Sequence, residues 1–427
     1  MIGELSALEA VDGCLARIEE LARLNAFTQV FAEEARARAR ELDSRSERGP
    51  LHGVPVAVKD LMAIAGHPTT CGTELHRHAP PASVSAEAVT ALETAGAVVV
   101  GATNLHEWAN GPTSSNPFYG PVRNPWDEER VPGGSSGGSA VAVATGMAWV
   151  ALGTDTAGSV RIPAACTGTA ALKPGSGRVS MRGVFPLSWS LDTVGPHAAR
   201  VVDLELPYRV LSGERRPLPS VELAGLRLGV EQTWYLRRGR IDPPVLEEFE
   251  RVLGELESAG AQLVEVTIPE LEGAETAEHT ILLAEASAVH DGDRRADRVE
   301  YGDEVRGYFE AGDRVLAIDY IRALRSREVL YDGFVRAFGD IDFAVSPTLP
   351  MLPPLIGETA HEWPDGSVGS VGELWRHTFP SNLADLPSLS QRCGFTGGLP
   401  VGLQLIGPRD SELGLLALGT AIEELLA

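Results

Sequence analysis

The sequence predicts an α/β protein built as one large domain. Short apolar runs bounded by glycine or polar residues alternate with segments of helical periodicity, which is typical of α/β proteins. The 427 residues include 44% hydrophobic residues, enough to bury a sizeable core. No repeat, low-complexity tract or linker interrupts the chain. We therefore expect a single domain over residues 1–427.

The first segments predict two helices followed by a buried strand. Apolar residues at helical spacing predict a helix over 5–24, and alternating Ala, Arg and Glu predict a second helix over 27–42. The apolar run 54–58 predicts a buried strand that places Lys59 at its carboxyl end. Because ligands of open α/β sheets bind beyond the carboxyl ends of strands, Lys59 is a candidate site residue.

The rest of the chain continues the alternation. Predicted helices cover 85–95, 136–145, 160–166, 244–259, 276–289, 305–311, 314–338 and 413–426. Predicted strands cover 98–101, 148–152, 226–230, 261–266, 342–345 and 401–406. Residues 103–126, rich in Asn, Gly, Pro and aromatic residues, predict a long loop with a short helix, and loops of this length are often functional.

Composition excludes several classes of function. The net charge of −23 argues against a nucleic-acid partner, since binding phosphate needs clustered basic residues. The acidic N-terminus does not predict a secretory signal, and no apolar run is long enough to predict a membrane span. The four cysteines lie far apart and the ten histidines form no ligand motif. We expect a cytoplasmic protein with buried reduced thiols, no metal and no cofactor.

Only two of the 36 basic residues are lysines, Lys59 and Lys173. Arginine keeps its proton in proteins, whereas a buried lysine can lose it. A lysine retained in such an arginine-rich chain is therefore a candidate for chemistry or for tight packing.

The stretch 132–163 contains two turns of small residues around an apolar segment. The first turn runs from Gly133 to Ser139 and the second from Gly153 to Ser159. Neither fits a P-loop or a GxGxxG motif. The GxSxG match around Ser136 lacks the preceding strand of a nucleophile elbow, so we expect Ser136 to be structural.

Ser159 stands where a predicted strand turns into a helix, a place where backbone N–H groups can converge on one oxygen. A serine nucleophile needs a base, and no histidine stands out. A desolvated Lys59 could act as that base, with a serine hydroxyl of the first turn as a proton relay. The residues thus indicate a Lys–Ser–Ser site.

Six motifs give the chain a resemblance to the amidase signature family over nearly its whole length. They are GVPVAVKD (53–60), RVPGGSSGGSA (130–140), GTDTAGSVRIPA (153–164), LKPGSGRVS (172–180), SLDTVGP (190–196) and LPVGLQLIGP (399–408). With the α/β alternation, the resemblance implies an α/β/α sandwich. Its central twisted sheet would be mixed but mostly parallel, with helices on both faces. The catalytic core would lie roughly at 50–200 and be completed by C-terminal strands and a helix.

The resemblance also implies roles for the residues of the two turns. Ser159 would be the acylating nucleophile, Ser135 the bridging serine after a cis peptide bond, and Lys59 the base. The backbone N–H groups of the second turn would form the oxyanion hole, and two neighbours would hold that loop. The oxyanion residues are Thr156, Ala157, Gly158 and Ser159 itself, and the loop-holding residues are Asp155 and Arg161. Lys173 would be structural.

Two departures from the family pattern lie outside the three catalytic positions. Ala157 replaces a glycine that is usual there and could reshape the acyl pocket. Gln391-Arg392 stands where an apolar residue and proline are common, and we expect this pair to be exposed. The loop 108–119 is expected to line the substrate site; its candidate substrate-binding residues are Asn110, Gly111, Thr113 and Tyr119.

The leading hypothesis is hydrolysis of the C–N bond of an amide, aryl amide or carbamate through a serine acyl-enzyme. The resemblance leaves two alternatives, a glutamine-hydrolysing amidotransferase subunit dependent on transfer RNA, and a hydrolase of urea-like (allophanate-type) compounds. A non-catalytic scaffold would not need an intact Lys–Ser–Ser set. The partner expected is a small-molecule amide or carbamate, with the protein a monomer or homodimer.

Overall fold

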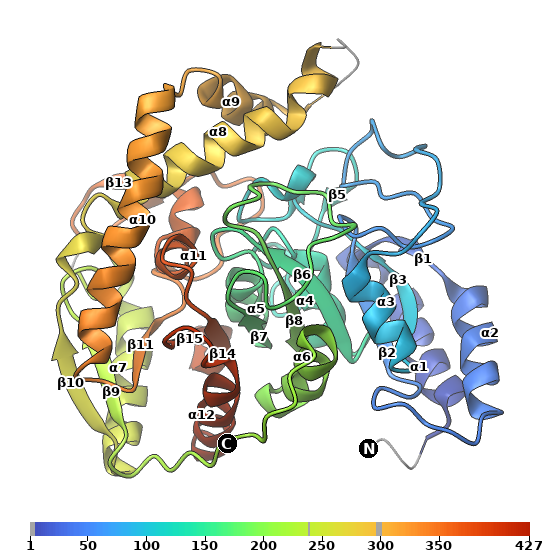
Figure 1. The fold of residues 1–427 in the computed structure, drawn as a ribbon, viewed down its shortest axis with the longest axis horizontal. Helices are drawn as coiled ribbons and strands as arrows, with labels where there is room; N and C mark the ends of the chain where they lie inside the picture. The colour runs from blue at the N-terminus through green and yellow to red at the C-terminus, as the bar shows by residue number, and fades with distance from the viewer. Residues whose placement is uncertain (1–4, 238–239, 296–300) are drawn as a thin grey trace.

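A computed structural model describes residues 5–237, 240–295 and 301–427. Its centre is an 11-stranded sheet in the order β1-β3-β2-β6-β8-β7-β14-β15-β11-β9-β10 (Figure 1). The strands are β1 Phe27–Val30, β2 Pro55–Lys59, β3 Val98–Thr103, β6 Val150–Asp155, β7 Ala170–Lys173, β8 Thr193–Ala198, β9 Arg227–Glu231, β10 Gln262–Val266, β11 Phe343–Pro347, β14 Ser388–Thr396 and β15 Leu399–Ile406. The mixed α/β fold class is confirmed.

The expected parallel majority is wrong. Among the described strands, β2, β3 and β6 run parallel, as do β9, β10 and β11, but the other six neighbouring pairs are antiparallel. One reason is the hairpin β14–β15. Its turn residues Gly397 and Gly398 both have positive φ, which is typical of a tight turn between antiparallel strands.

Helices cover both faces of the sheet. The main ones are α1 Ala7–Glu20, α2 Ala32–Asp43, α3 Glu87–Thr94, α4 Gly137–Ala144, α5 Arg161–Thr167, α6 Glu205–Ser212, α7 Pro243–Ser258, α8 Ala274–Arg295, α9 Asp303–Gly312, α10 Ala317–Phe338, α11 Phe379–Leu383 and α12 Glu412–Leu425. Side chains of α1, α2 and α4 pack with Ala57 and Ala151, whereas α3 packs with Val56, Val58 and Leu152. Neighbouring residues of one strand thus face opposite helical layers.

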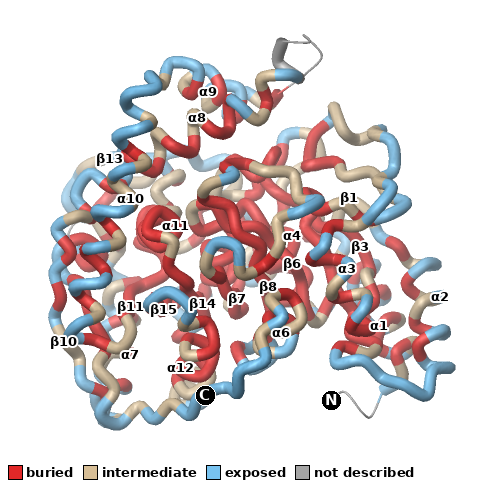
Figure 2. The backbone as a smooth tube through the Cα atoms, in the orientation of Figure 1, coloured by how far each residue is buried: buried red, intermediate tan, exposed pale blue. Residues whose placement is uncertain are grey.

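The buried residues follow the strands, and the outer helices carry the exposed ones (Figure 2). The helices α8, α9 and α10 gather at one side of the molecule (Figure 1). No helix of the described part is long and apolar enough to cross a membrane.

The predicted helix over 27–42 is wrong in its first turn. Phe27–Val30 forms β1 and pairs antiparallel with β3, and α2 begins only at Ala32. Aromatic and β-branched residues favour a strand at 27–30, and the Ala/Arg/Glu pattern starts after them. The strands β7, β8 and β14 and the short helices α6 and α11 were not predicted. Gln391 is buried in β14 and only Arg392 is exposed, so half of the expected exposed pair is wrong.

The sheet brings the predicted site residues together. Strands β2 and β6 are parallel neighbours, with Val58 opposite Leu152. Lys59 therefore ends one strand beside the end of the other, where Thr154 and Asp155 lead into the second turn. The predicted 103–126 loop contains only the one-turn 3-10 helix Glu107–Ala109 and the small hairpin β4 Ser115–Asn116 and β5 Gly120–Pro121.

Candidate active site

Lys59 is fully buried at the end of β2 and contacts two hydroxyls. Its Nζ donates to Ser135 Oγ and to Thr154 Oγ1, each at 2.8 Å. Burial lowers the pKa of Lys59 to about 7, although the carboxylates of Asp192 and Asp155 oppose the shift. Near neutral pH, a large share of Lys59 is therefore an uncharged amine that can accept a proton.

The first turn places Ser135 against that amine. The peptide bond between Gly134 and Ser135 is cis, as the family resemblance implied. Ser136 is structural in its contacts, since its Oγ donates to the Thr154 carbonyl at 3.2 Å and its backbone N–H donates to the Ser159 carbonyl at 3.2 Å. The second of these bonds ties the two turns side by side.

Ser159 is the least buried residue of the set. Its residue exposure is 8%, whereas Ser135 and Lys59 are at 0%. Ser159 lines the same pocket as Thr156 and Ala157. Of the three side chains, Ser159 is thus the one that a substrate can reach, and the other two stand behind it.

Asp155 and Arg161 stabilise the second turn through hydrogen bonds to its backbone and to each other. Asp155 accepts from the backbone N–H groups of Gly158 at 2.8 Å and Val160 at 3.1 Å. Arg161 donates to both carboxylate oxygens, at 3.0 and 3.1 Å. Burial alone would raise the pKa of Asp155, but the charge and hydrogen bonds of Arg161 outweigh it and lower that pKa to about 2.

The guanidinium of Arg161 also joins the turn to distant segments. It donates to the Thr378 carbonyl, to Ser381 Oγ and to Gln404 Oε1 at 2.7–2.8 Å. Asn382 accepts a further hydrogen bond from Arg161 and donates to Asp155. Helix α11 and strand β15 are thereby fixed to the start of α5.

Asp192 holds the other side of the turn. It accepts from Thr156 Oγ1 at 2.6 Å and from the backbone N–H groups of Leu187 and Ser188. Burial raises the pKa of Asp192 to about 7 despite these bonds. The turn is therefore held by one ionised carboxylate, Asp155, and by one that titrates near neutrality.

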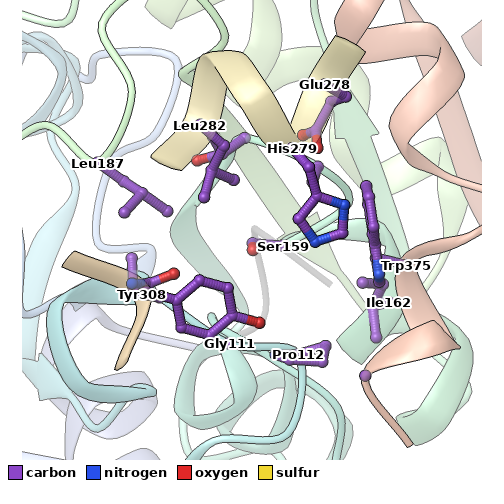
Figure 3. A pocket seen from close by; sticks show the side chains of 15 residues that line it. Gly111, Pro112, Ser159, Ile162, Leu187, Glu278, His279, Leu282, Tyr308 and Trp375 are labelled. Carbon is purple, nitrogen blue, oxygen red and sulfur yellow. The ribbon is translucent and has the colours of Figure 1, made fainter. Parts of the chain in front are cut away.

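A pocket opens over Ser159 between the second turn, the 108–119 loop and the helices α8 and α9 (Figure 3). The apolar lining of the pocket includes Leu187, Leu282, Ile162 and Trp375. Polar groups come from Glu278 and His279 of α8 and from Tyr308 of α9, with Asn110 and Gly111 from the loop.

Two of the four expected substrate-binding residues do not line this pocket. Asn110 and Gly111 do, but Thr113 contacts His106 Nδ1 at 3.3 Å, and Tyr119 lies under the Arg77 guanidinium at 4.4 Å. The loop turns away from the pocket after Pro112, because the hairpin β4–β5 directs residues 113–121 elsewhere.

Comparisons with known proteins show the family of this chain. The sequence matches the Amidase family over residues 9–416. The chain belongs to the amidase family. The chain is 38% identical to a glutamyl-tRNA(Gln) amidotransferase subunit of Symbiobacterium thermophilum, over 99% of this chain and 94% of that protein. It is 39% identical to an amidase of Pseudomonas putida, with 99% and 93% covered.

Solved structures agree. A crystal structure of an amidase is 36% identical to this chain, with a TM-score of 0.95. The match covers 100% of this chain and 98% of that one. A bacterial aryl acylamidase of the amidase signature family is 26% identical over 99% of this chain and 93% of that one, with a TM-score of 0.89. The predicted family and the predicted enzyme class, hydrolases of carbon–nitrogen bonds other than peptide bonds, are confirmed.

Several residues of this amidase site were not predicted. Thr154 and Asp192 lie inside the recognised motifs, and their side-chain positions emerge only from the pairing of β6 with β8. Glu278, His279, Tyr308 and Trp375 come from segments without a motif. An acidic residue and a histidine side by side on an otherwise amphipathic helix were the only signal for the first two.

Lys173 is buried, and its Nζ donates to the Pro174 carbonyl at 3.1 Å. That contact agrees with a structural role. Within residues 5–237, 240–295 and 301–427, no group of three or more His, Cys, Asp or Glu side chains could hold a metal ion.

Proposed function

We propose that this member of the amidase family hydrolyses the C–N bond of an amide, aryl amide or carbamate through an acyl-enzyme on Ser159. The observation that carries the proposal is the 2.8 Å contact between Lys59 Nζ and Ser135 Oγ, beside a Ser159 that lines the pocket. A buried amine with a pKa near 7 is a base that requires no histidine.

In the proposed first half-reaction, neutral Lys59 takes the Ser135 hydroxyl proton while Ser135 takes that of Ser159. Ser159 Oγ then attacks the carbonyl carbon, and the carbonyl oxygen becomes an oxyanion. Collapse of this intermediate breaks the C–N bond, and the proton held by Lys59 returns through Ser135 to the leaving nitrogen. Water repeats the sequence on the acyl-enzyme and releases the carboxylic acid or, from a carbamate cleaved at its C–N bond, the half-ester of carbonic acid.

Backbone N–H groups of the second turn would stabilise the oxyanion. The Gly158 N–H donates to Asp155 Oδ1 at 2.8 Å, which argues against Gly158 as a donor in the state described. We assign the role to Thr156, Ala157 and Ser159. Asp155 and Arg161 act as positioning residues that fix the curvature of this turn.

The pocket lining favours a neutral or cationic substrate. Among the described lining residues there is no Lys or Arg to bind a carboxylate, and the apolar side chains suit an aryl or alkyl group. A carbamate has the same reacting carbonyl and remains within the proposal. We also propose that the enzyme acts in the cytoplasm as a monomer or homodimer, which the high negative charge and the four free cysteines support.

The experiment is turnover of a panel of primary amides, aryl amides and carbamates by the wild type and by Ser159→Ala. We expect hydrolysis by the wild type and at least a thousandfold lower kcat in the variant, with an unchanged circular-dichroism spectrum. A Ser159→Ala enzyme that retains activity would exclude the acyl-enzyme mechanism.

The second candidate is release of ammonia from glutamine, which the 38% identity to an amidotransferase subunit favours. Glutamine carries a carboxylate, for which the described pocket lining offers no Lys or Arg side chain. Ammonia release from glutamine that exceeds that from simple amides, or copurification of a second subunit, would decide for this candidate.

A further inference from the structure

Glu278 is a buried carboxyl group without a protein partner. It lies on α8 at 0% exposure, and neither of its carboxyl oxygens has a hydrogen-bond partner among the described residues. An unsatisfied buried polar group destabilises the folded protein, and it does so more strongly when it is charged. Buried polar groups are usually paired, so this exception needs an explanation.

The carboxyl group faces the substrate pocket. Glu278 lines the same pocket as Ser159, and Figure 3 shows its side chain reaching from α8 towards the space above the nucleophile. Burial raises the pKa of Glu278 well above the ordinary value, and the charges of Glu275 and Asp155 add to that effect. Without a cation beside it, Glu278 is therefore held as the neutral acid, and a positive charge next to the carboxyl group would favour its ionisation.

The other polar side chains of the pocket cannot neutralise a carboxylate. His279 stands edge-on to the Trp375 ring at 4.5 Å between centroids, and burial lowers the pKa of His279, which keeps the imidazole neutral. Burial raises the pKa of Tyr308 to about 12, so its hydroxyl stays protonated. No Lys or Arg occurs among the described lining residues.

We propose that Glu278 is a specificity determinant that binds an ammonium group of the substrate. The enzyme would then prefer amides whose apolar or aryl body carries a primary amine and no carboxylate. An incoming ammonium supplies both the hydrogen-bond donor and the positive charge that the site lacks. The inference rests on the proposed function, since it concerns the same pocket.

The test compares three benzamides that carry an aminomethyl, a methyl or a carboxylate group at the para or meta position, and the corresponding acetanilides. The two series place the ring in the acyl part and in the leaving amine. For at least one series we expect wild-type kcat/KM to be at least about tenfold higher for the aminomethyl than for the methyl compound, and lowest for the carboxylate. A wild type without preference for the amine in either series would overturn the inference without any variant.

Glu278→Gln keeps the side-chain shape and removes the charge. We expect the aminomethyl-to-methyl ratio of kcat/KM to fall towards one in this variant. The matched control is Glu310→Gln, which removes the same charge from an exposed position on α9, the other helix that lines the pocket. The control should retain the wild-type ratio, and a Glu278→Gln enzyme that also retains it would overturn the inference.

A binding measurement separates this inference from the proposed function. Calorimetry would follow benzylamine and benzoate binding to Ser159→Ala and to Ser159→Ala/Glu278→Gln. We expect benzylamine to bind the first variant and to lose at least about tenfold in affinity in the second. If the wild type hydrolyses no amide but benzylamine binds in this way, the proposed function fails and the ammonium site stands. Hydrolysis without an amine preference would support the proposed function and overturn the ammonium site.

Discussion

At the scale of single residues, Lys59 is the group whose protonation state decides whether the site can react. The Nζ is enclosed by Ser135 and Thr154 and has no exposed surface. Only the neutral amine can accept the proton of Ser135.

Lys59→Arg tests this requirement. Arginine has a side chain of similar length but stays positively charged, because it cannot release its proton in a protein. We expect kcat for the best amide substrate to fall by at least about a thousandfold, a loss within the range of general-base removal. Arg178→Lys, at a partly exposed surface position, is the control for exchanging lysine and arginine outside the site, and it should keep the wild-type kcat. Activity near the wild-type level in Lys59→Arg would contradict a base at this position.

The pH profile gives a second prediction at this scale. Because burial lowers the pKa of Lys59 to about 7, kcat/KM should fall on the acid side of about pH 7 and level off above it. The Asp192 charge raises the pKa of Lys59. Asp192→Asn keeps an acceptor for Thr156 and removes that charge, so the acid limb should move to lower pH. An acid limb that moves to higher pH in Asp192→Asn, or that stays in place, would contradict the assignment of this limb to Lys59.

At the scale of elements, the buried pair of Asp155 and Arg161 connects β6, α5, α11 and β15. Removing one partner of such a pair leaves an uncompensated charge. We expect Arg161→Met to lower the free energy of unfolding by about 3–5 kcal/mol, measured by urea denaturation. The exposed pair of Arg17 and Glu20 offers the control, because Arg17→Met should change the midpoint little. If Arg161→Met and Arg17→Met lowered the free energy of unfolding equally, the buried pair of Asp155 and Arg161 would stabilise the fold no more than an exposed ion pair does.

Gly158 supplies the curvature of the second turn. Its φ is +135°, and a Cβ added there would lie 2.0 Å from Thr378 Oγ1. We therefore expect Gly158→Ala to displace the turn and reduce kcat at least a hundredfold. Gly146→Ala, at a positive φ of 72° but with open space around it, should keep most of the activity. Comparable activity losses in the two variants would mean that the strain of positive φ, and not the contact with Thr378, is responsible.

At the scale of the whole molecule, the sequence predicts the part of the site that is formed by the strand ends and by the two turns of small residues. The apolar runs 54–58 and 148–152 predict two strands, and the parallel pairing of β2 with β6 brings their ends together. The small-residue turns could be located because glycine and serine are concentrated there. Periodicity also gave most of the long helices.

What the sequence did not predict depends on contacts between distant segments. Thr378, Ser381 and Gln404 reach Arg161 from more than 200 residues away. Glu278 and Tyr308 enter the pocket only because α8 and α9 pack across it. The interior strand β7 has only four residues, and the interior strand β8 contains glycine, proline and histidine, so the strand character of both comes from the sheet around them.

The most direct test of the central claim is to locate the covalent intermediate. The wild type, Ser135→Ala and Ser159→Ala would be treated with a fluorophosphonate and examined by intact-protein and peptide mass spectrometry. We predict one adduct, on Ser159, formed more slowly in Ser135→Ala and absent from Ser159→Ala. An adduct on Ser135, or one that forms at the wild-type rate in Ser159→Ala, would contradict the assignment of Ser159 as the nucleophile.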